Sequence, residues 1–239
     1  MLFTDQTALI TGASSGVGRA TALAFARQGA AVLVTARRKD RLASLCDLIR
    51  SEGGKAEYIA GDATLESTAD AAVAAALRHF GQIDHLINNA GMGNYKNIVD
   101  TTVEEYDQLV DTNLKSGFLF TRAAVPHMVA RRSGSILFVS SVAGLQGAAG
   151  ESVYCATKFA QAGMAQSLDF ELRKHNIKVG CFFPGGTKTE FALGKGRTEE
   201  SVAASHMMDP AEVAEAILFM SSRPANSRVN QMTLRHMGL

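Results

Sequence analysis

The chain has 239 residues, 46% of them hydrophobic, with 22 glycines and only 4 prolines. This composition suits one α/β domain, since such folds often exceed about 200 residues as a single unit. Lysine and arginine total 24 against 23 acidic residues. The net charge of +1 gives no indication of the excess basic charge that is typical of nucleic-acid-binding proteins. No apolar stretch is long enough to span a bilayer.

Apolar, β-branched runs alternate with helical patterns along the chain. The runs read as buried parallel strands near 7–11, 31–35, 56–60, 83–87, 135–140 and 177–182, with a final strand around 229–235. Helices are expected near 16–28, 39–52, 66–80, 103–130 with a break near 112, 153–174, and from the N-cap pair Asp209-Pro210 to about 221. This alternation predicts a single-domain, doubly wound parallel sheet with helices on both faces, covering residues 1–239.

The first predicted strand runs into a glycine-rich turn, Gly12-Ala13-Ser14-Ser15-Gly16-Val17-Gly18, which opens a helix. Glycines allow unusual backbone conformations and let a ligand approach the main chain. The first N–H groups of a helix lack internal partners, so a pyrophosphate fits there. The first gap is longer than in the usual dinucleotide fingerprint, and any tight turn could use such glycines. The strand-turn-helix context favours dinucleotide binding.

Tyr154 and Lys158 are four residues apart, and Ser141 lies thirteen residues before Tyr154. If this run is helical, the ammonium lies beside the phenol, because residues i and i+4 share a helix face. A neighbouring cation lowers the pKa of a phenol from its usual value of about 10. The three groups could therefore act on one carbonyl. Alternatively, Tyr154 and Lys158 are surface residues of an ordinary amphipathic helix and have no catalytic role.

In these motifs the chain resembles the short-chain dehydrogenase/reductase (SDR) family. The likeness covers roughly residues 5 to 190 and rests on five motifs in order: Thr11 to Gly18, Asn88-Asn89-Ala90-Gly91, Asn113, Ser141 with Tyr154 and Lys158, and Pro184-Gly185. The resemblance implies a Rossmann-like fold and a nicotinamide-dependent oxidoreductase that interconverts an alcohol and a ketone or aldehyde.

The resemblance also implies catalytic roles. Tyr154 would exchange a proton with the substrate oxygen, and Lys158 would lower the Tyr154 pKa and bond the nicotinamide ribose. Ser141 would hydrogen-bond the substrate oxygen; Ser140 is a rival, but the spacing to the tyrosine matches the family at Ser141. Asn113 would break its helix and hold a water in a proton relay, or would only cap the helix.

The residues after the second strand indicate the cofactor. Where NAD-binding folds place an acid for the ribose 2′-hydroxyl, this chain has Ala36, followed by Arg37. Arginine can bind a 2′-phosphate through two hydrogen bonds, which predicts NADP(H), unless the basic run 37–39 is only a solvated helix cap. Other residues that the resemblance places at the cofactor are Gly12, Ser14, Ser15, Gly16, Val17, Gly18, Asp62, Asn89, Ala90, Gly91, Tyr154, Lys158, Pro184, Gly185, Thr187 and Thr189.

Two of these cofactor predictions leave an alternative open. Asn89 could be structural instead, and the family often has an aliphatic residue where Thr187 stands. If the backbone of Thr187 makes the contact with the nicotinamide, this departure matters little.

The least patterned segment, 185–208, is interpreted as a substrate lid or equally as a surface loop.

The ending 227–235 is similar to that of relatives acting on 3-hydroxy acids, which favours a small polar substrate. A 3-oxoacyl-thioester reductase is the alternative within the class. A catalytically weak NADP-sensing protein is the rival from another class; an epimerase or dehydratase is a third possibility, which the short C-terminal region disfavours.

Compartment and assembly follow from simpler features. The three cysteines form neither a disulfide framework nor a metal cluster, no histidine spacing suggests a metal, and the N-terminus leaves no room for a cleavable signal. These features predict a cytoplasmic protein without a metal.

Related enzymes pair the helices here expected at 103–130 and 153–174 across a two-fold axis, which predicts a homotetramer or homodimer. Alternatively, both helices only pack on their own sheet.

Overall fold

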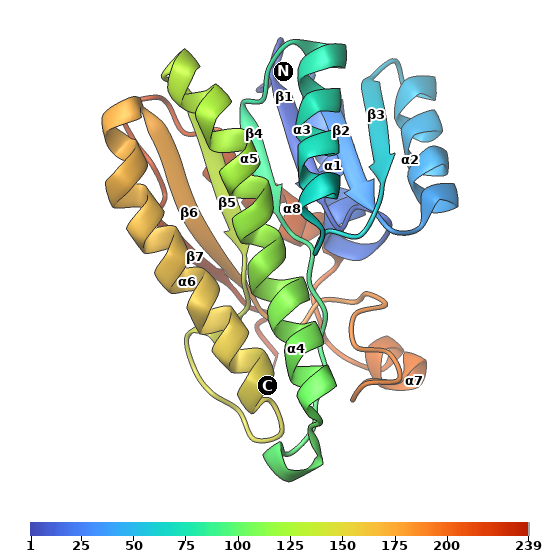
Figure 1. Cartoon of the computed structure of the whole chain (residues 1–239). Coiled ribbons are helices and arrows are strands. Elements are labelled where there is room, and N and C mark those ends of the chain that lie inside the picture. Colours follow the sequence, from blue (N-terminus) through green and yellow to red (C-terminus); the bar gives the residue numbers. More distant parts are fainter. Residues whose placement is uncertain (239) are drawn as a thin grey trace.

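The computed structural model of the protein describes residues 1–238 and contains one seven-stranded sheet (Figure 1). All strands are parallel, in the order β3-β2-β1-β4-β5-β6-β7. Their bounds are β1 Thr7–Thr11, β2 Ala31–Ala36, β3 Lys55–Ala60, β4 His85–Asn88, β5 Gly134–Val139, β6 Ile177–Pro184 and β7 Gln231–Leu234. The predicted doubly wound sheet is confirmed, and its order changes direction between β1 and β4.

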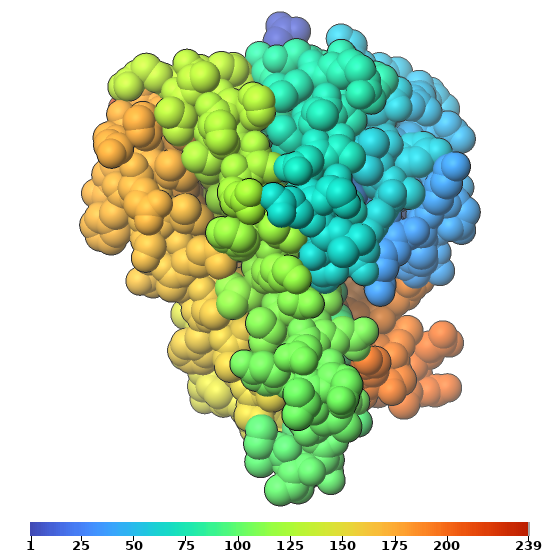
Figure 2. Space-filling view, viewed as in Figure 1, coloured from blue at the N-terminus to red at the C-terminus, as the bar shows by residue number. Residues whose placement is uncertain are grey.

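Helices cover both faces of the sheet. On one face lie α1 (Gly16–Arg27), α2 (Lys39–Ser51) and α8 (Pro210–Ser221). On the other lie α3 (Glu66–Phe80), α4 (Val103–Val110), α5 (Ser116–Arg131) and α6 (Ser152–Leu172), whose teal, green and yellow atoms form the middle and left of the surface in Figure 2. The short helix α7 (Glu199–Ala203) lies near the carboxyl ends of the strands (Figure 1).

The sheet is rigid because both of its faces are buried. Successive strand side chains point to opposite faces. Leu9 accordingly packs with α3 and α5, whereas Ile10 packs with α1 and α8. All five residues of β1 are buried, which explains the uninterrupted apolar run in the sequence. The fold thus holds the carboxyl ends of β1, β4 and β5 in fixed positions.

The break predicted near 112 has the form of a π-helical turn. The α-helix α4 ends at Val110 and α5 begins at Ser116, and the residues between them, Asp111–Lys115, are π-helical. A π turn shifts the backbone hydrogen bonds to i→i+5 and is frequent at functional sites. Asn113 lies in this turn and is fully buried. Asn113 thus lies where the α-helical pattern is interrupted, although the chain stays helical from Val103 to Arg131.

The remaining differences lie at the boundaries and in short elements. The strand expected at 83–87 occupies His85–Asn88, and just before it the Asp84 carboxylate accepts a hydrogen bond from the backbone N–H of Thr7 (2.8 Å). Sequence patterns did not predict α7 or the 3₁₀ turns at Ile98–Asp100, Val142–Gly144 and Arg173–His175. Across residues 1–238, no helix combines the length and apolarity needed to traverse a bilayer.

Candidate active site

A cleft of about 1000 Å³ opens at the carboxyl ends of the strands. It spans the position where the strand order changes direction, which is where open α/β sheets bind ligands. The predicted catalytic residues Ser141, Tyr154 and Lys158 line it. So do all the predicted cofactor residues: Gly12, Ser14, Ser15, Gly16, Val17, Gly18, Arg37, Asp62, Asn89, Ala90, Gly91, Pro184, Gly185, Thr187 and Thr189. Asn113 lies behind this lining.

The glycine-rich turn at the start of α1 has no room for larger residues. Gly12 and Gly16 have φ of +68° and +53°, a region that favours glycine. A Cβ on Gly18 would lie 2.5 Å from both the Gly12 carbonyl oxygen and the Asn89 amide nitrogen. The tight turn brings the start of α1 to the cleft, which Gly16, Val17 and Gly18 line, and a helix N-terminus there fits a dinucleotide pyrophosphate.

Asn89 fastens the loop after β4 to the end of β1. Its side-chain amide donates to the Thr11 carbonyl (2.9 Å), while the Asn89 and Ala90 backbone N–H groups donate to the Thr11 hydroxyl (3.0 and 2.9 Å). The structural role that the sequence left open for Asn89 is thus present. Because these bonds fix the loop, they also fix the wall that Ala90 and Gly91 contribute to the cleft.

Tyr154 lies near the N-terminus of α6 and is only 5% exposed. Its ring contacts Tyr95 and Phe191, with centroids 5.7 and 5.9 Å away. Burial raises the pKa of Tyr154 well above its ordinary value, the nearby Tyr95 raises it further, and the Ser141 hydroxyl acts in the opposite direction. The effect of burial prevails in this structure, and a lowering of the Tyr154 pKa by Lys158 stays a prediction.

Lys158 lies beside Tyr154, with Nζ 5.7 Å from the phenol centroid. Its ammonium donates to the Val139 carbonyl and to Oε1 of Gln161, both at 3.1 Å. Burial lowers the pKa of Lys158 to about 8. Gln161 in turn donates to the Asn113 carbonyl at the π turn. Sequence reasoning missed Gln161, although its place three residues after Lys158 puts it on the same helix face.

The Asn113 side chain holds two other segments together. Its Oδ1 accepts from the Met92 N–H (2.7 Å), and its Nδ2 donates to the Met92 carbonyl and to the Thr157 hydroxyl (both 3.0 Å). Asn113 therefore links the loop after β4 to α6, the helix that carries Tyr154 and Lys158. Its role in a water-mediated proton relay stays a prediction.

The two candidate serines differ in their hydrogen bonds. The Ser140 hydroxyl is buried and donates to the Lys158 backbone carbonyl (2.9 Å), which anchors α6 to the end of β5. The half-buried Ser141 hydroxyl accepts from the Ala143 N–H (3.2 Å). Ser141 thus keeps its own proton available for a substrate oxygen, whereas Ser140 does not.

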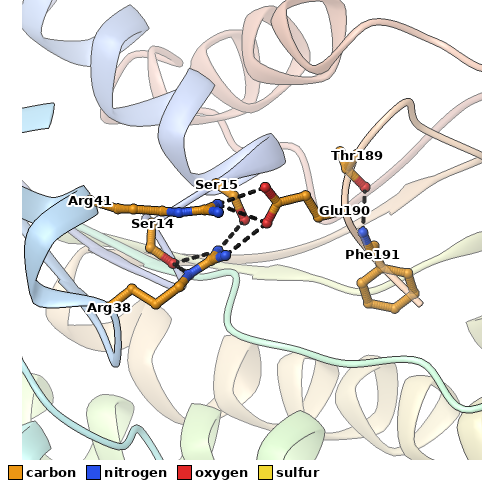
Figure 3. A network of polar contacts seen from close by, with 7 residues as sticks. All are labelled: Ser14, Ser15, Arg38, Arg41, Thr189, Glu190 and Phe191. Atoms are coloured by element: carbon orange, nitrogen blue, oxygen red, sulfur yellow. Dashed lines mark hydrogen bonds and ion pairs between the residues drawn. The ribbon is translucent and has the colours of Figure 1, made fainter. Parts of the chain in front are cut away.

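Two arginines lie at the far end of the cleft. Arg37 is exposed and Arg38 is half-buried; both line the cleft. Arg38 donates to the hydroxyls of Ser14 (3.0 and 3.1 Å) and Ser15 (2.7 Å) in the glycine-rich turn (Figure 3). The sequence singled out Arg37 and missed Arg38, because a run of three cations does not tell which side chain points into the site.

Asp62, one of the predicted cofactor residues, is fixed by two hydrogen bonds from Thr64. Its Oδ1 accepts from the Thr64 N–H and hydroxyl, both at 2.9 Å. The backbone hydrogen bond from Thr64 is the main reason that the Asp62 pKa lies below its ordinary value. A fixed carboxylate at this end of the cleft suits an amino group of a base.

The segment 185–208 covers the cleft. Its base is fastened where the Lys188 N–H donates to the Met208 carbonyl (2.9 Å) and Thr187 pairs with Met208 as an isolated bridge. Farther along, the Arg197 guanidinium lies 5.6 Å from the Tyr95 ring centroid and 5.7 Å from that of Phe191. Arg197 forms no ion pair with any residue in the described part of the chain. Sequence patterns could not place these lid side chains.

Comparison with known proteins agrees with this geometry. The model of a family described as short chain dehydrogenase matches residues 6–200. The chain belongs to the short-chain dehydrogenase family. An uncharacterised oxidoreductase of Staphylococcus epidermidis is 31% identical over 231 residues, which cover 97% of each chain.

Two solved structures extend the likeness across the whole short-chain dehydrogenase fold. An alcohol dehydrogenase from the archaeon Thermococcus sibiricus, complexed with 5-hydroxy-NADP, superposes with a TM-score of 0.87 at 26% identity, covering 97% of each chain. A metagenomic short-chain oxidoreductase in complex with NADP has a TM-score of 0.86 at 29% identity and covers 100% of each chain. The predicted family is thereby confirmed.

The cysteines and histidines of this short-chain dehydrogenase lie outside the catalytic chemistry described so far. Within residues 1–238, no group of three His, Cys, Asp or Glu side chains is arranged to hold a metal ion. Cys46, Cys155 and Cys181 are buried and unpaired. Burial raises the pKa of the Cys181 thiol to about 12, which keeps that thiol protonated beside the active site.

Proposed function

We propose that the protein is an NADP(H)-dependent oxidoreductase that interconverts an alcohol and a ketone or aldehyde, with Tyr154 as acid and base. One observation carries this proposal: Ser141, Tyr154 and Lys158 converge at one end of a cleft whose other end holds the glycine-rich turn. A nicotinamide bound in the cleft would supply or accept the hydride.

The side chains account for the rest of the chemistry. The raised pKa of Tyr154 keeps its phenol protonated at neutral pH, so the phenol can donate a proton when a carbonyl is reduced. The Ser141 hydroxyl hydrogen-bonds the substrate oxygen and stabilises the charge that develops there. Lys158 provides a cation beside the phenolate that proton transfer leaves behind. Gln161 and Asn113 hold that lysine in place.

The NADP(H) preference rests on Ala36, Arg37 and Arg38 at the end of β2. A neutral residue stands where an acid would repel a 2′-phosphate, and two guanidinium groups lie beside it. The two solved relatives described above were crystallised with NADP or a derivative, which supports the same assignment.

Cofactor titration tests this preference. Ala36→Asp with Arg37→Leu should weaken NADPH binding by roughly 10- to 100-fold, the value of one charge-assisted contact, and should improve NADH binding. Fluorescence titration of both reduced cofactors against parent and variant measures the effect. A parental protein that binds NADH as tightly as NADPH would overturn the preference.

We propose a small substrate that carries a carboxylate, such as a 3-hydroxy acid and its keto acid. Arg197 supports this choice, since its half-buried guanidinium lies over the aromatic rings that contact Tyr154. The cation is close enough to Tyr154 to oppose, weakly, the rise of its pKa. A substrate carboxylate could pair with Arg197 while its carbonyl reaches Ser141 and Tyr154.

A substrate screen distinguishes the candidate functions. NADPH consumption would be followed with keto acids, their esters, diketones, aldehydes and 3-oxoacyl thioesters. Arg197→Met should raise KM for keto acids by about tenfold or more and leave the esters unchanged, because only the acids use the cation. Preferred turnover of thioesters would favour the acyl reductase instead. Absence of turnover on every carbonyl would favour an NADP-sensing protein.

A further inference from the structure

Glu190 joins the lid to the cofactor end of the cleft. Its carboxylate accepts from Nη1 of Arg38 (2.8 Å) and from Nη1 of Arg41 (2.6 and 2.9 Å), as Figure 3 shows. Arg41 belongs to the first turn of α2, whereas Glu190 follows β6 and the first residues of the lid. This carboxylate therefore bridges two cations that flank the end of β2.

The bridge leaves Arg38 without a free nitrogen. Its Nε and Nη2 donate to the Ser14 and Ser15 hydroxyls, and its Nη1 donates to Glu190. An anion that binds Arg38 through the Nη1 N–H that points at Glu190 must displace this carboxylate. A phosphate has the same requirement for paired N–H donors as this carboxylate.

The residue before Glu190 supports the same interpretation. The Thr189 methyl group lies 2.9 Å from the position of a Cβ built on Gly16, so Thr189 packs directly on the glycine-rich turn. Adjacent lid residues thus cover both the turn at the start of α1 and the arginines after β2. In both places a phosphate group of a dinucleotide would be expected.

We propose that Glu190 is an internal anion that competes with the adenosine 2′-phosphate for Arg38 and Arg41, and thereby moderates the preference for NADP(H) over NAD(H). The inference rests on the proposed NADP(H) function. With a cofactor that lacks the 2′-phosphate, Glu190 stays on both arginines and neither is left unpaired. With NADPH, the carboxylate and the phosphate require the same donors and repel each other, so the lid segment gives up its ion pairs.

The expected size of the effect follows from exposure. The three side chains are 40 to 46% exposed, and an exposed ion pair changes an equilibrium constant by about 1.4- to 5-fold. Glu190 makes two such pairs, so Glu190→Gln, which removes the charge and keeps the shape, should tighten NADPH binding by roughly 2- to 25-fold. NADH binding should change by less than about twofold, since NADH does not use these donors.

A matched control is available in the same lid. Glu199 is exposed at the start of α7 and forms no ion pair within residues 1–238. Glu199→Gln removes the same charge from the lid without touching Arg38 or Arg41. Its NADPH and NADH dissociation constants should equal those of the parent, which separates the specific contact from a general effect of lid charge.

Fluorescence titration of the parent and both variants with NADPH and with NADH tests the inference. Selective tightening of NADPH by Glu190→Gln supports it. An unchanged NADPH affinity in that variant, or equal tightening of both cofactors, overturns it while the proposed function stands. A parental protein that binds neither cofactor overturns the proposed function, and the competition with it.

Limited trypsin digestion without cofactor gives a second readout. The lid contains the cleavable residues Lys195 and Arg197. Cleavage there should be faster in Glu190→Gln than in the parent and in Glu199→Gln, because the bridge to Arg38 and Arg41 no longer holds the segment. Equal cleavage rates in the three proteins would show that Glu190 does not anchor the lid, and would overturn the inference.

Discussion

Burial determines the protonation of the two central residues of the candidate site. The pKa of Tyr154 rises and that of Lys158 falls to about 8, because each loses water around its charged form. At neutral pH the site therefore combines a protonated phenol with a lysine that is still mostly cationic. That combination suits proton donation to a carbonyl oxygen.

Removal of a single oxygen atom tests the proton donor. Tyr154→Phe keeps the ring against Tyr95 and Phe191, so the melting temperature and the NADPH affinity should stay close to those of the parent. The rate of carbonyl reduction should fall by about 10²- to 10⁴-fold, the usual contribution of general acid catalysis. Tyr95→Phe is the matched control and should keep most of the activity. Near-parental kcat in Tyr154→Phe would show that another group donates the proton.

The pKa of Lys158 predicts where the rate of carbonyl reduction declines on the alkaline side of its pH profile. Lys158 is cationic below about pH 8 and neutral above it, so kcat for carbonyl reduction should decline as the pH rises through about 8. Gln161→Glu would put a carboxylate where the amide oxygen now lies 3.1 Å from Nζ. An anion there favours the charged lysine, so the decline should move to higher pH. An unmoved limb in this variant, measured with intact fold, would assign it to another group.

At the scale of elements, β4 carries a buried histidine that links stability to pH. The ring of His85 lies against Phe3 and Phe25, at 5.0 and 5.3 Å between centroids, and its Nε2 is 2.6 Å from Oε1 of Gln6. Burial lowers the pKa of His85 to about 4. The unfolded chain, with a histidine pKa of about 6.5, therefore binds this proton more readily than the folded protein.

The sign of the resulting pH dependence is clear. The contribution of neutral His85 is complete above about pH 6.5 and is lost as the pH falls towards 4, with a total on the order of 3 kcal/mol. Urea unfolding at pH 7.5 and pH 5 should show a larger loss of unfolding free energy in the parent than in His85→Asn. His79→Gln, which changes an exposed histidine, should behave like the parent. Equal losses in all three proteins would contradict the assignment.

The elements that could be predicted are those whose pattern reflects a buried surface. Strands such as β1 and β2 read directly from uninterrupted apolar runs, because both faces of a parallel sheet are covered. The glycine-rich turn and the proximity of Tyr154 to Lys158 could likewise be predicted, because each depends only on residues close together in the chain. The π turn at Asp111–Lys115 could not, because the residue that bonds its Asn113 carbonyl, Gln161, lies 48 positions later, on α6.

The lid marks the limit of prediction from sequence. Glu190 and Arg197 face Arg38 and Tyr95 from more than a hundred residues away, and nothing in the segment 185–208 repeats with a helical or strand period. Charge partners of this kind depend on where a loop folds back. The sequence likewise did not reveal that burial raises the Tyr154 pKa. The spacing identifies Lys158 as a neighbour of Tyr154, but it does not tell how deeply either residue is buried.

At the scale of the whole molecule, α6 presents an exposed face formed by Ala156, Phe159, Gly163 and Phe170. Nothing lies within 4 Å of a Cβ built on Gly163. Ala162 and Ala165, by contrast, pack inward with the sheet, so only part of the small-residue set is used within one chain. Phe118 on α5 is also exposed. A homodimer or homotetramer that pairs these helices therefore stays our prediction, as does a cytoplasmic location.

Light scattering coupled to size exclusion measures the assembly. We expect a particle of two or four times the 25.4 kDa chain, because a closed interface would cover the aromatic side chains of α5 and α6. Phe118→Glu with Phe159→Glu should shift the particle towards the monomer mass. Leu65→Glu, on an exposed residue before α3, should not. A fully active parent that elutes at the monomer mass would remove the prediction.

The pairing of β1 with β4 also orders events during synthesis of the chain. Thr11 and Asn89 are hydrogen-bonded beside the cleft although they are separated by 78 positions in the chain. Thr7 and Asp84 are hydrogen-bonded at the other end of the same strand pair. While residues up to about 84 are being made, one edge of β1 has no neighbour, and the glycine-rich turn lacks the loop that packs against it. Affinity for a nucleotide should thus arise only after the ribosome has released residue 90. A labelled nucleotide added to stalled nascent chains of increasing length would report the moment at which the centre of the sheet closes.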